Sequence, residues 1–388
     1  MAEWLGSAVA LHTRVADATP LVLVRPRQIR ARAQRVLAAF PGEVLYAVKC
    51  NDAPEVLDAL VAGGIRGFDV ASIGEIRNLR QRFGEHIALA FMHPVKPAPA
   101  VREAYFAHGV RRFAFDHPDE LARIRAATDG AGDLELVVRI AVSGEGSALP
   151  LSGKFGATPE EAVALLRLAR PHARSLGLTF HVGSQCTEPA SFERAIALAG
   201  EIARRAGGID HLDVGGGFPA RYTGSEPAFE SFVQAIRRAV QRAGLGHVRL
   251  ACEPGRLLVA DGASVLTRVE LRRGHSLFLD DGIYGNLAEL RWLGPCFPIR
   301  ALRDGRVLHG PSADFELFGP TCDSIDSMPG PHRLPEGVRA GDLLEVGMAG
   351  AYTWALRTRF NGFPEARRLS VDDPAWYLRE DPQVARAA

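Results

Sequence analysis

Four charged or titratable residues stand at or near the ends of short apolar runs. Lys49 follows VLYAV, Asp69 lies in GFDVAS, Arg139 nearly ends LELVVRI and His181 lies in LTFHVG. A lysine partly removed from water keeps a neutral amine fraction and can form a Schiff base with an aldehyde. A surface lysine is the commoner alternative, but a charge directly after a buried strand usually faces a cleft. His181 could stack on a flat cofactor, or it could be a satisfied core histidine.

Two glycine-containing turns follow later apolar runs. Three glycines occupy positions 215–217 after HLDV, and Glu253 begins the turn EPGR after VRLAC. Consecutive glycines let backbone N–H groups approach and hold a phosphate, or they form an ordinary tight turn. Glu253 could keep a heteroaromatic nitrogen protonated and so strengthen an electron sink, with a plain strand-end carboxylate as the alternative. Arg256 could add charge to the phosphate site or form a surface ion pair.

A regular alternation of strands and helices positions these turns. Between about residues 25 and 260, β-prone runs alternate with stretches whose apolar residues recur near the helical period. The expected strands lie at 44–49, 67–72, 87–92, 112–116, 134–140, 178–183, 211–216 and 248–255. The expected helices lie at 54–62, 72–83, 118–127, 159–175, 191–206 and 229–243. Ser72 with Glu75 has the spacing of a capping box.

Eight such units match a (β/α)₈ barrel in number and length. We therefore predict an α/β protein with a barrel over residues 25–261, and a doubly wound open sheet is the alternative. In a barrel the carboxyl ends of all strands face one mouth, so Lys49, the glycines and Glu253 would converge there. Short β-prone segments between Gly, Pro and Asp turns predict a separate antiparallel β domain over residues 262–388. Residues 1–24, which include LVLVR, would add a strand to it.

Composition excludes several classes of protein. Lys plus Arg (46) and Asp plus Glu (45) nearly cancel, which gives no reason to expect nucleic acid or an anionic membrane as a partner. Five cysteines without a CxxC pair argue against a disulfide framework and against a zinc site, and we expect no metal. The sequence has neither a signal-peptide pattern nor an apolar run approaching the ~20 residues that span a bilayer. We expect a soluble cytoplasmic protein.

Nine motifs lie in order along nearly the whole chain. They are YAVKCN (46–51), GFDVASIGEI (67–76), KFGA (154–157), FHVGSQC (180–186), LDVGGGFP (212–219), CEPGR (252–256), DDGIYG (280–285), GPTCDSID (319–326) and AGAYTWALRTRFNGF (349–363). With these motifs the chain resembles the ornithine/diaminopimelate/arginine decarboxylases, which are fold-type III pyridoxal-phosphate enzymes, and most of all the ornithine decarboxylases. The resemblance implies a barrel of the alanine-racemase type followed by a β domain.

The resemblance implies pyridoxal 5′-phosphate as the cofactor and a role for each matching residue. Lys49 would be the Schiff-base lysine, with Asp69 and Glu75 supporting it. Glu253 would pair with the pyridine nitrogen, and His181 would stack on the ring. The full cofactor-binding set is Lys49, Asp69, Arg139, His181, Ser184, Gly216, Gly217, Glu253, Pro254, Gly255, Arg256 and Tyr352. Within it, the phosphate would be held by Ser184, Gly217, Gly255, Arg256 and Tyr352.

Two adjacent residues of the GPTCDSID motif carry the remaining chemistry. Cys322 resembles the residue that protonates the carbanion after CO₂ leaves, and it is the second predicted catalytic residue beside Lys49. Asp323 resembles the carboxylate that meets the distal ammonium of the substrate. In this family both are supplied across a dimer interface, so the resemblance implies an obligate homodimer with shared sites. A small buried thiol and a turn aspartate are the alternative interpretations.

One segment departs from the family pattern. Shortly after DDGIYG, ornithine decarboxylases typically carry a Tyr-Asp pair whose Asp contacts the distal amine. Counted without gaps, this chain has Trp292-Leu293 there, and we expect both at the substrate's distal end. One carboxylate is missing unless Glu289 or another residue replaces it, and a cation with a single carboxylate is held less firmly.

The resemblance implies decarboxylation of a basic L-amino acid, with L-ornithine to putrescine in polyamine biosynthesis as the main hypothesis. Lysine, arginine or another pathway-specific amino acid is the first alternative. A racemase or aldolase on the same barrel is disfavoured by Glu253 and the Cys322-Asp323 pair. A catalytically inactive binding homologue, similar to the antizyme inhibitors, is disfavoured because Lys49, Glu253 and Cys322 are all retained.

Overall fold

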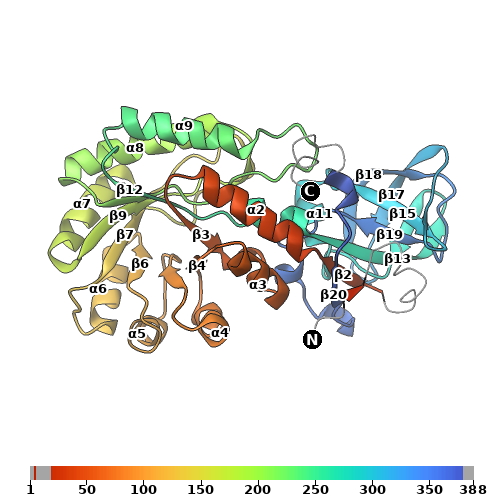
Figure 1. Cartoon of the computed structure of the whole chain (residues 1–388), viewed down its shortest axis with the longest axis horizontal. Helices are drawn as coiled ribbons and strands as arrows, with labels where there is room; N and C mark the ends of the chain where they lie inside the picture. Colours follow the sequence, from red (N-terminus) through yellow and green to blue (C-terminus); the bar gives the residue numbers. More distant parts are fainter. Residues whose placement is uncertain (1–3, 6–18, 379–388) are drawn as a thin grey trace.

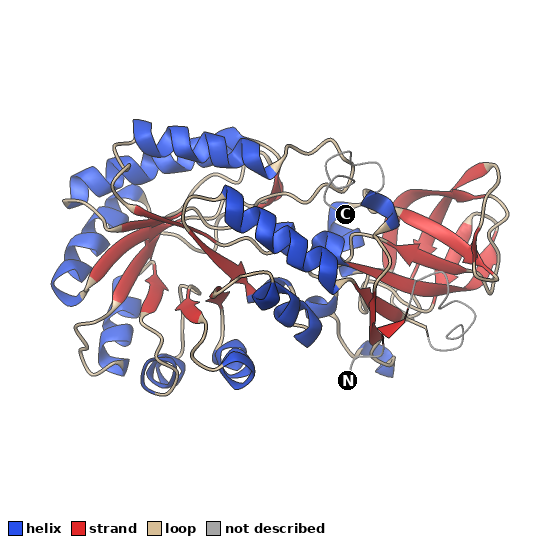
Figure 2. Ribbon diagram, in the orientation of Figure 1, coloured by secondary structure: helices blue, strands red, loops and turns tan. Residues whose placement is uncertain are grey.

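The structure is a computed structural model that describes residues 4–5 and 19–378. Its described part forms a barrel of parallel strands, and a strand-rich domain lies beside it (Figure 1). Figure 2 shows the helices gathered around the barrel strands and few helices in the second domain. Parts of the predicted β domain, residues 1–3, 6–18 and 379–388, lie outside the described residues.

Eight described strands close the barrel in the order β11-β12-β3-β4-β5-β6-β7-β9, and all neighbouring pairs are parallel. This confirms the predicted fold class. Their bounds are β3 (Glu43–Ala47), β4 (Gly67–Val70), β5 (Ala88–Phe91), β6 (Arg112–Phe115), β7 (Glu135–Arg139), β9 (Ser175–Thr179), β11 (His211–Asp213) and β12 (Arg249–Cys252). The prediction for the sixth strand was wrong by several residues: it begins at Ser175, where a helix was expected to end, and stops before His181.

The described outer helices include all six of the expected ones, but the helices over 26–39 and 98–106 were not among those expected, and the one that begins at 159 ends at 169 instead of 175. They are α2 (Pro26–Ala39), α3 (Pro54–Ala62), α4 (Ile73–Phe83), α5 (Ala98–Phe106), α6 (Pro118–Ala127), α7 (Pro159–Ala169), α8 (Pro189–Ala206) and α9 (Phe229–Arg242). Most begin with a proline in the first turn, where its missing N–H costs nothing. Ser72 caps α4 by accepting a hydrogen bond from the Glu75 backbone at 3.2 Å. On α8, Phe192, Ala195 and Ile196 recur at helical spacing and are buried against the barrel.

The second domain is a ten-stranded sheet as far as the structure describes it. Its long strand β13 (Ala263–Arg273) pairs antiparallel with β2, β14 and β19. The prediction of a purely antiparallel sheet was too simple, because β20 runs parallel to β1 and β2, and β14 runs parallel to β17. The other strands are β1 (Trp4–Leu5), β2 (Leu21–Val24), β14 (Ser276–Leu279), β15 (Ile299–Arg303), β16 (Arg306–Val307), β17 (Ser312–Phe318), β18 (Ser327–Pro335), β19 (Leu343–Val346) and β20 (Arg367–Val371).

The chain crosses between the two domains twice, and the crossings lie side by side. Strand β2 leads into α2 of the barrel, and β13 leaves the barrel antiparallel to β2. Arg25, which follows β2, donates its backbone N–H to Gly262 and its guanidinium to Ser264, both at 2.8 Å. Its buried ion pair with Glu345 of β19, at 3.1 Å, ties the same point to the sheet.

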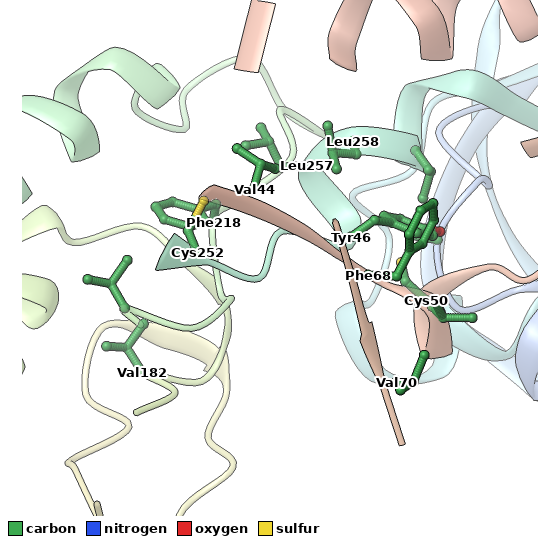
Figure 3. Close-up of a cluster of buried hydrophobic side chains, with 14 of the residues drawn as sticks. Val44, Tyr46, Cys50, Phe68, Val70, Val182, Phe218, Cys252, Leu257 and Leu258 are labelled. Atoms are coloured by element: carbon green, nitrogen blue, oxygen red, sulfur yellow. The ribbon is translucent and has the colours of Figure 1, made fainter. Parts of the chain in front are cut away.

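Apolar packing fixes the end of the first barrel strand. Figure 3 shows Tyr46, Cys50 and Phe68 grouped where β3 ends. The rings of Tyr46 and Phe68 meet edge to face with centroids 6.2 Å apart, and Tyr46 donates its hydroxyl to the Asn51 carbonyl at 2.8 Å. Burying each ring stabilises the fold by about 1.5–3 kcal/mol. The backbone therefore leaves β3 in one conformation, a short 3₁₀ turn over Val48–Cys50.

A small two-stranded sheet lies at the barrel mouth and has no counterpart in the predicted elements. Strand β8 (Ser147–Leu149) pairs antiparallel with β10 (Ser184–Cys186), so the loop after β7 lies against the loop after β9. Gly183 between them has φ +97°, and a Cβ there would lie 2.2 Å from the Ser147 hydroxyl. Among the described helices, none has the length and apolar character needed to span a membrane.

Candidate active site

Lys49 and Asp69 lie together at the carboxyl ends of β3 and β4. Lys49 is in the 3₁₀ turn after β3 rather than at the end of the strand, and its Nζ donates to the carboxylate of buried Asp69. Its side chain is 42% exposed, so a ligand can reach it. Loss of hydration disfavours the charged amine, but the charge of Asp69 and its hydrogen bond outweigh this effect and raise the pKa of Lys49. The amine is therefore protonated here, with a proton acceptor beside it.

Glu75 holds the turn that follows Asp69. Its carboxylate accepts from the Ala71 backbone at 2.6 Å, and its own backbone N–H is capped by Ser72. Burial raises the pKa of Glu75 to about 7, and the charge of Asp69 adds to the shift. Glu75 thus fixes the turn between Asp69 and helix α4.

His181 and Arg139 lie on the opposite side of the mouth. His181 Nδ1 accepts from the Gly183 backbone at 3.1 Å, which leaves the ring proton on Nε2. Burial, with Arg139 and Lys49 nearby, lowers the pKa of His181 to about 3. The imidazole is therefore neutral near pH 7 and offers a flat uncharged face. The Arg139 guanidinium lies 5.5 Å from the Phe155 ring centroid.

Glu253 is the buried carboxyl of the site. Its Oε1 has no hydrogen-bond partner among the described residues. Burial raises the pKa of Glu253 well above its ordinary value, and the charges of Asp69 and Asp213 add to the shift. A carboxyl that keeps its proton and has a free acceptor atom can share a proton with a ligand's ring nitrogen.

Backbone contacts fix Glu253 relative to Lys49. The Glu253 backbone N–H donates to Gly215 at 2.8 Å, and the Ala47 backbone N–H donates to Pro254 at 3.3 Å. A Cβ on Gly255 would come within 2.9 Å of the Cys50 side chain. Only a glycine lets the loop after β12 approach the Lys49 turn this closely.

The glycine turn after β11 requires its glycines for conformation and for space. Gly215 and Gly217 have φ of +68° and +99°, which side-chain-bearing residues rarely adopt. A Cβ on Gly217 would lie 2.4 Å from the Gly183 carbonyl, and one on Gly216 would lie 2.7 Å from the Glu253 carbonyl. The turn therefore presents bare backbone at the mouth, as an anion site needs.

Arg256 begins the short helix α10 (Arg256–Val259) and is buried beside this turn. Its Nη2 donates to the Ser184 hydroxyl at 3.1 Å, and its Nη1 donates to the Tyr222 hydroxyl at 2.8 Å. The ring of Tyr352 lies 5.0 Å from the guanidinium carbon, and the Tyr352 backbone donates to Cys50 at 2.9 Å. Three residues far apart in sequence thus surround one buried cation.

Cys322 and Asp323 lie in the β domain and have their own partners there. The Cys322 thiol is exposed and lies 3.5 Å from the Asn361 side-chain oxygen. Tyr284 donates its hydroxyl to Asp323 at 2.6 Å, and this bond, with one from the Ile325 backbone, lowers the pKa of Asp323. The hydrogen-bond partners of this pair are all β-domain residues, unlike those of Lys49.

The sequence profile described as "Pyridoxal-dependent decarboxylase, pyridoxal binding domain" matches residues 26–260. The chain belongs to this family. It is 34% identical over 384 residues to the lysine/ornithine decarboxylase of Selenomonas ruminantium, with 95% of each chain covered. It is 31% identical over 362 residues to antizyme inhibitor 2 of Xenopus laevis, with 86% of this chain and 76% of that protein covered. The crystal structure of lysine/ornithine decarboxylase from Vibrio vulnificus, complexed with cadaverine, matches with a TM-score of 0.81 at 30% identity, covering 95% and 99% of the two chains.

This decarboxylase uses pyridoxal phosphate, and the described residues fit that cofactor. The unpartnered Glu253 Oε1 suits a ring nitrogen, the glycine turn and Arg256 suit a phosphate, and the Lys49 amine suits an aldehyde. The sequence predicted each of these residues from its motif. It did not predict Tyr222, which binds Arg256 and lies in a segment without a distinctive motif.

The segment that departs from the family pattern forms helix α11 (Ala288–Leu293). Trp292 is 63% exposed, and Leu293 is partly buried beside a surface hollow that Tyr222, Glu226 and Cys296 also line. Glu289 was a candidate to replace the aspartate that ornithine decarboxylases typically carry in this segment. Its carboxylate instead pairs with the buried Arg256 at 2.5 Å.

Proposed function

We propose that the chain decarboxylates basic L-amino acids and that L-ornithine, giving putrescine, is its preferred substrate. The observation that carries this proposal is the Asp323 carboxylate, which its hydrogen bond from Tyr284 keeps ionised beside the Cys322 thiol. An anion next to a proton donor suits a substrate with a second ammonium group. The lysine/ornithine decarboxylases among its relatives support the same class of substrate.

In the proposed mechanism, pyridoxal phosphate supplies, when bound, an electron sink for the pair released with CO₂. Asp69 accepts the proton of Lys49 Nζ when a neutral amine is required. Glu253 keeps a proton at its buried carboxyl and shares it with the ring nitrogen. The neutral His181 ring orients a flat ligand, and Cys322 Sγ delivers a proton to the substrate carbon.

The cofactor's phosphate would be bound by residues from three loops of the barrel mouth and by Tyr352, which follows β19 of the β domain. Arg256 supplies N–H donors beside the Ser184 hydroxyl. The glycine turn supplies bare backbone, and Tyr352 closes the other side of the guanidinium. Charge-assisted hydrogen bonds of this kind are the strong ones, so these contacts would account for much of the cofactor's affinity.

We propose further that two copies of the chain share their active sites. Cys322 is exposed, and large apolar side chains around it are exposed as well: Ile325 (50%), Phe360 (41%) and Phe363 (40%). Clustered apolar exposure of this kind is typical of a surface that another chain covers. Cys322 and Asp323 of one copy would then complete the site around Lys49 of the other.

Lysine is the second candidate substrate, and Leu293 is the observation that favours it. Leu293 itself supplies no carboxylate at this position, so it cannot select one chain length by pairing with a distal ammonium. Arginine and pathway-specific amino acids belong to the same set. The place in polyamine biosynthesis and the cytoplasmic location expected from the sequence stay predictions.

Steady-state rates with ornithine, lysine, arginine and diaminopimelate test the substrate directly. We expect kcat/KM to be highest for ornithine, with lysine next. Ornithine slower than all the others would overturn the choice of substrate but not decarboxylation. Release of D-amino acid without CO₂ would overturn decarboxylation itself.

A further inference from the structure

Arg256 uses its hydrogen-bond donors unevenly. Its Nη1 donates to the Tyr222 hydroxyl at 2.8 Å and to the Glu289 carboxylate at 2.5 Å. Its Nη2 and Nε both reach the Ser184 hydroxyl, at 3.1 and 3.4 Å. The Nη1 end of the planar guanidinium is therefore held by Tyr222 and Glu289, and the Nε–Nη2 edge faces Ser184, a proposed phosphate ligand.

Glu289 is held as firmly as the arginine that it binds. Its side chain is 4% exposed, and it lies in the first turn of α11. Asp281 fixes the start of that helix, because it accepts from the backbone and the side chain of Asn286, both at 2.9 Å. The Glu289 carboxylate thus has a defined position before any ligand arrives.

We propose that Glu289 is a positioning residue for the cofactor's phosphate. It holds Nη1, together with Tyr222, so that the Nε–Nη2 edge of Arg256 is turned toward the phosphate. This edge is the one that binds phosphate through two parallel hydrogen bonds, so its orientation matters for affinity. The inference rests on the proposed phosphate-binding role of Arg256.

Physical arguments favour this role over the two alternatives. A carboxylate already paired with a buried guanidinium is a poor partner for the distal ammonium of a substrate, because leaving the pair would strand Arg256 as an unpaired buried charge. A purely structural pair would not require a particular orientation of Arg256. Here Nη1 is bound by Glu289 and Tyr222, and the Nε and Nη2 donors both reach the hydroxyl of Ser184, a proposed phosphate ligand.

Binding of two ligands that differ only in the phosphate tests the proposal without measuring turnover. Pyridoxal phosphate and pyridoxal are titrated into the cofactor-free full chain, and the two Kd values are compared for each variant. Glu289→Asp keeps the charge but shortens its reach, so it pulls Arg256 out of line. We expect about tenfold weaker binding of pyridoxal phosphate and pyridoxal binding within about twofold of wild type.

Glu289→Gln is the conservative variant that should rescue the alignment. Its side-chain oxygen still accepts from Nη1, and the negative charge nearest the phosphate is gone, so pyridoxal phosphate should bind at least as tightly as in wild type. Tyr222→Phe removes the other Nη1 partner without a change of charge. We expect a smaller loss there, about threefold and again confined to pyridoxal phosphate.

Three results would overturn the inference. They are unchanged binding in Glu289→Asp, equal losses for both ligands, and a Glu289→Gln variant as weak as Glu289→Asp. Arg256→Lys separates this failure from that of the proposed function, because lysine cannot offer a two-donor edge. If Arg256→Lys weakens both ligands equally, the phosphate role of Arg256 fails. If it weakens only pyridoxal phosphate while Glu289→Asp has no effect, the role of Glu289 alone fails.

Discussion

The barrel mouth and the Cys322 segment of the β domain carry the two halves of the proposed chemistry and are built differently. At the mouth, Lys49, Glu253 and Arg256 are held by backbone bonds, glycine contacts and buried ion pairs from several strands. In the β domain, Cys322 is exposed, and its nearest partner is the exposed Asn361. One region is arranged by the folding of a single chain. The other has the residues but, among the described residues, lacks surroundings that could exclude water, and the proposed sharing of sites between two chains rests on this difference.

Loss of Lys49 should have the largest effect on activity, because it removes the amine at the barrel mouth that binds the cofactor's aldehyde. Lys49→Ala should lower kcat by at least about 10⁴-fold and abolish the absorbance band of the protein-bound cofactor. Arg27→Ala, at an exposed ion pair on α2, is the surface control and should leave both unchanged. An intact band in Lys49→Ala would contradict the assignment of the lysine.

Mixing two inactive variants tests whether Lys49 and Cys322 of one active site come from different chains. Lys49→Ala and Cys322→Ala should each be inactive alone. When refolded or co-expressed together, random pairing of the two chains should restore up to about a quarter of wild-type activity, because half of the dimers carry one intact shared site. No recovery, with mixed dimers shown to form by mass spectrometry, would mean that each chain completes its own site.

Glu253 tests the electrostatics of the mouth. Glu253→Gln keeps the size of the side chain but removes the proton that the buried carboxyl shares, so kcat should fall about 10²-fold. Cofactor content, measured by absorbance, should stay within about twofold of wild type, since an amide can still bond to the ring nitrogen. A fall in cofactor content that matches the fall in kcat would indicate a binding role only.

A variant of Asp323 tests whether the β domain contributes to substrate binding. Asp323→Asn should raise KM for ornithine and lysine by about tenfold through loss of a charge-assisted hydrogen bond, with a smaller change in kcat. The slow decarboxylation of norvaline, which has no distal ammonium, is the internal control and should not change. Equal effects on norvaline and ornithine would remove Asp323 from substrate recognition.

Tyr284→Phe should have the smallest effect on KM for ornithine, and the effect should be seen only at acidic pH. The Tyr284 hydroxyl lowers the pKa of Asp323, so the carboxylate stays charged as the pH falls and loses its charge only below the ordinary range. Without the hydroxyl the pKa rises, and KM for ornithine should begin to increase at a higher pH than in wild type. Near pH 7 the two proteins should agree within about twofold, since both carboxylates are ionised there. Coincident pH profiles would contradict this coupling.

The sequence predicted the barrel well because its signals are local. Alternating apolar runs, N-terminal prolines and the Ser72 cap each act within a few residues, and the observed helices begin where they indicate. The sixth strand was misplaced because SLGLTFHVG is apolar throughout, so periodicity alone could not say where pairing stops. The two-stranded sheet of β8 and β10 was missed because three-residue strands are too short to show a period and the two strands are far apart in the sequence.

Motifs predicted which residues belong to the mouth but not the network behind them. Lys49, Glu253 and Arg256 were found because each lies in a recognisable segment. Glu289 and Tyr222 lie 33 and 34 residues from Arg256, and only folding brings them to its Nη1. No sequence spacing reports a contact of that kind. The parallel pairs of the β domain, such as β14 with β17, were missed for the same reason.

The paired crossings at Arg25 and Gly262 bear on how a substrate enters. A domain joined to another by a single strand can rotate about that connection. Two antiparallel strands that are hydrogen-bonded along their length restrict this rotation. The ion pair between Arg25 and Glu345 ties this pair of strands to a third strand, β19. The barrel and the β domain should therefore behave as one rigid block on the timescale of turnover. Substrate entry and product release would then depend on loops such as the one that carries β8, or on small movements between the chains of the proposed dimer. A hinge motion between the two domains of one chain would not be needed.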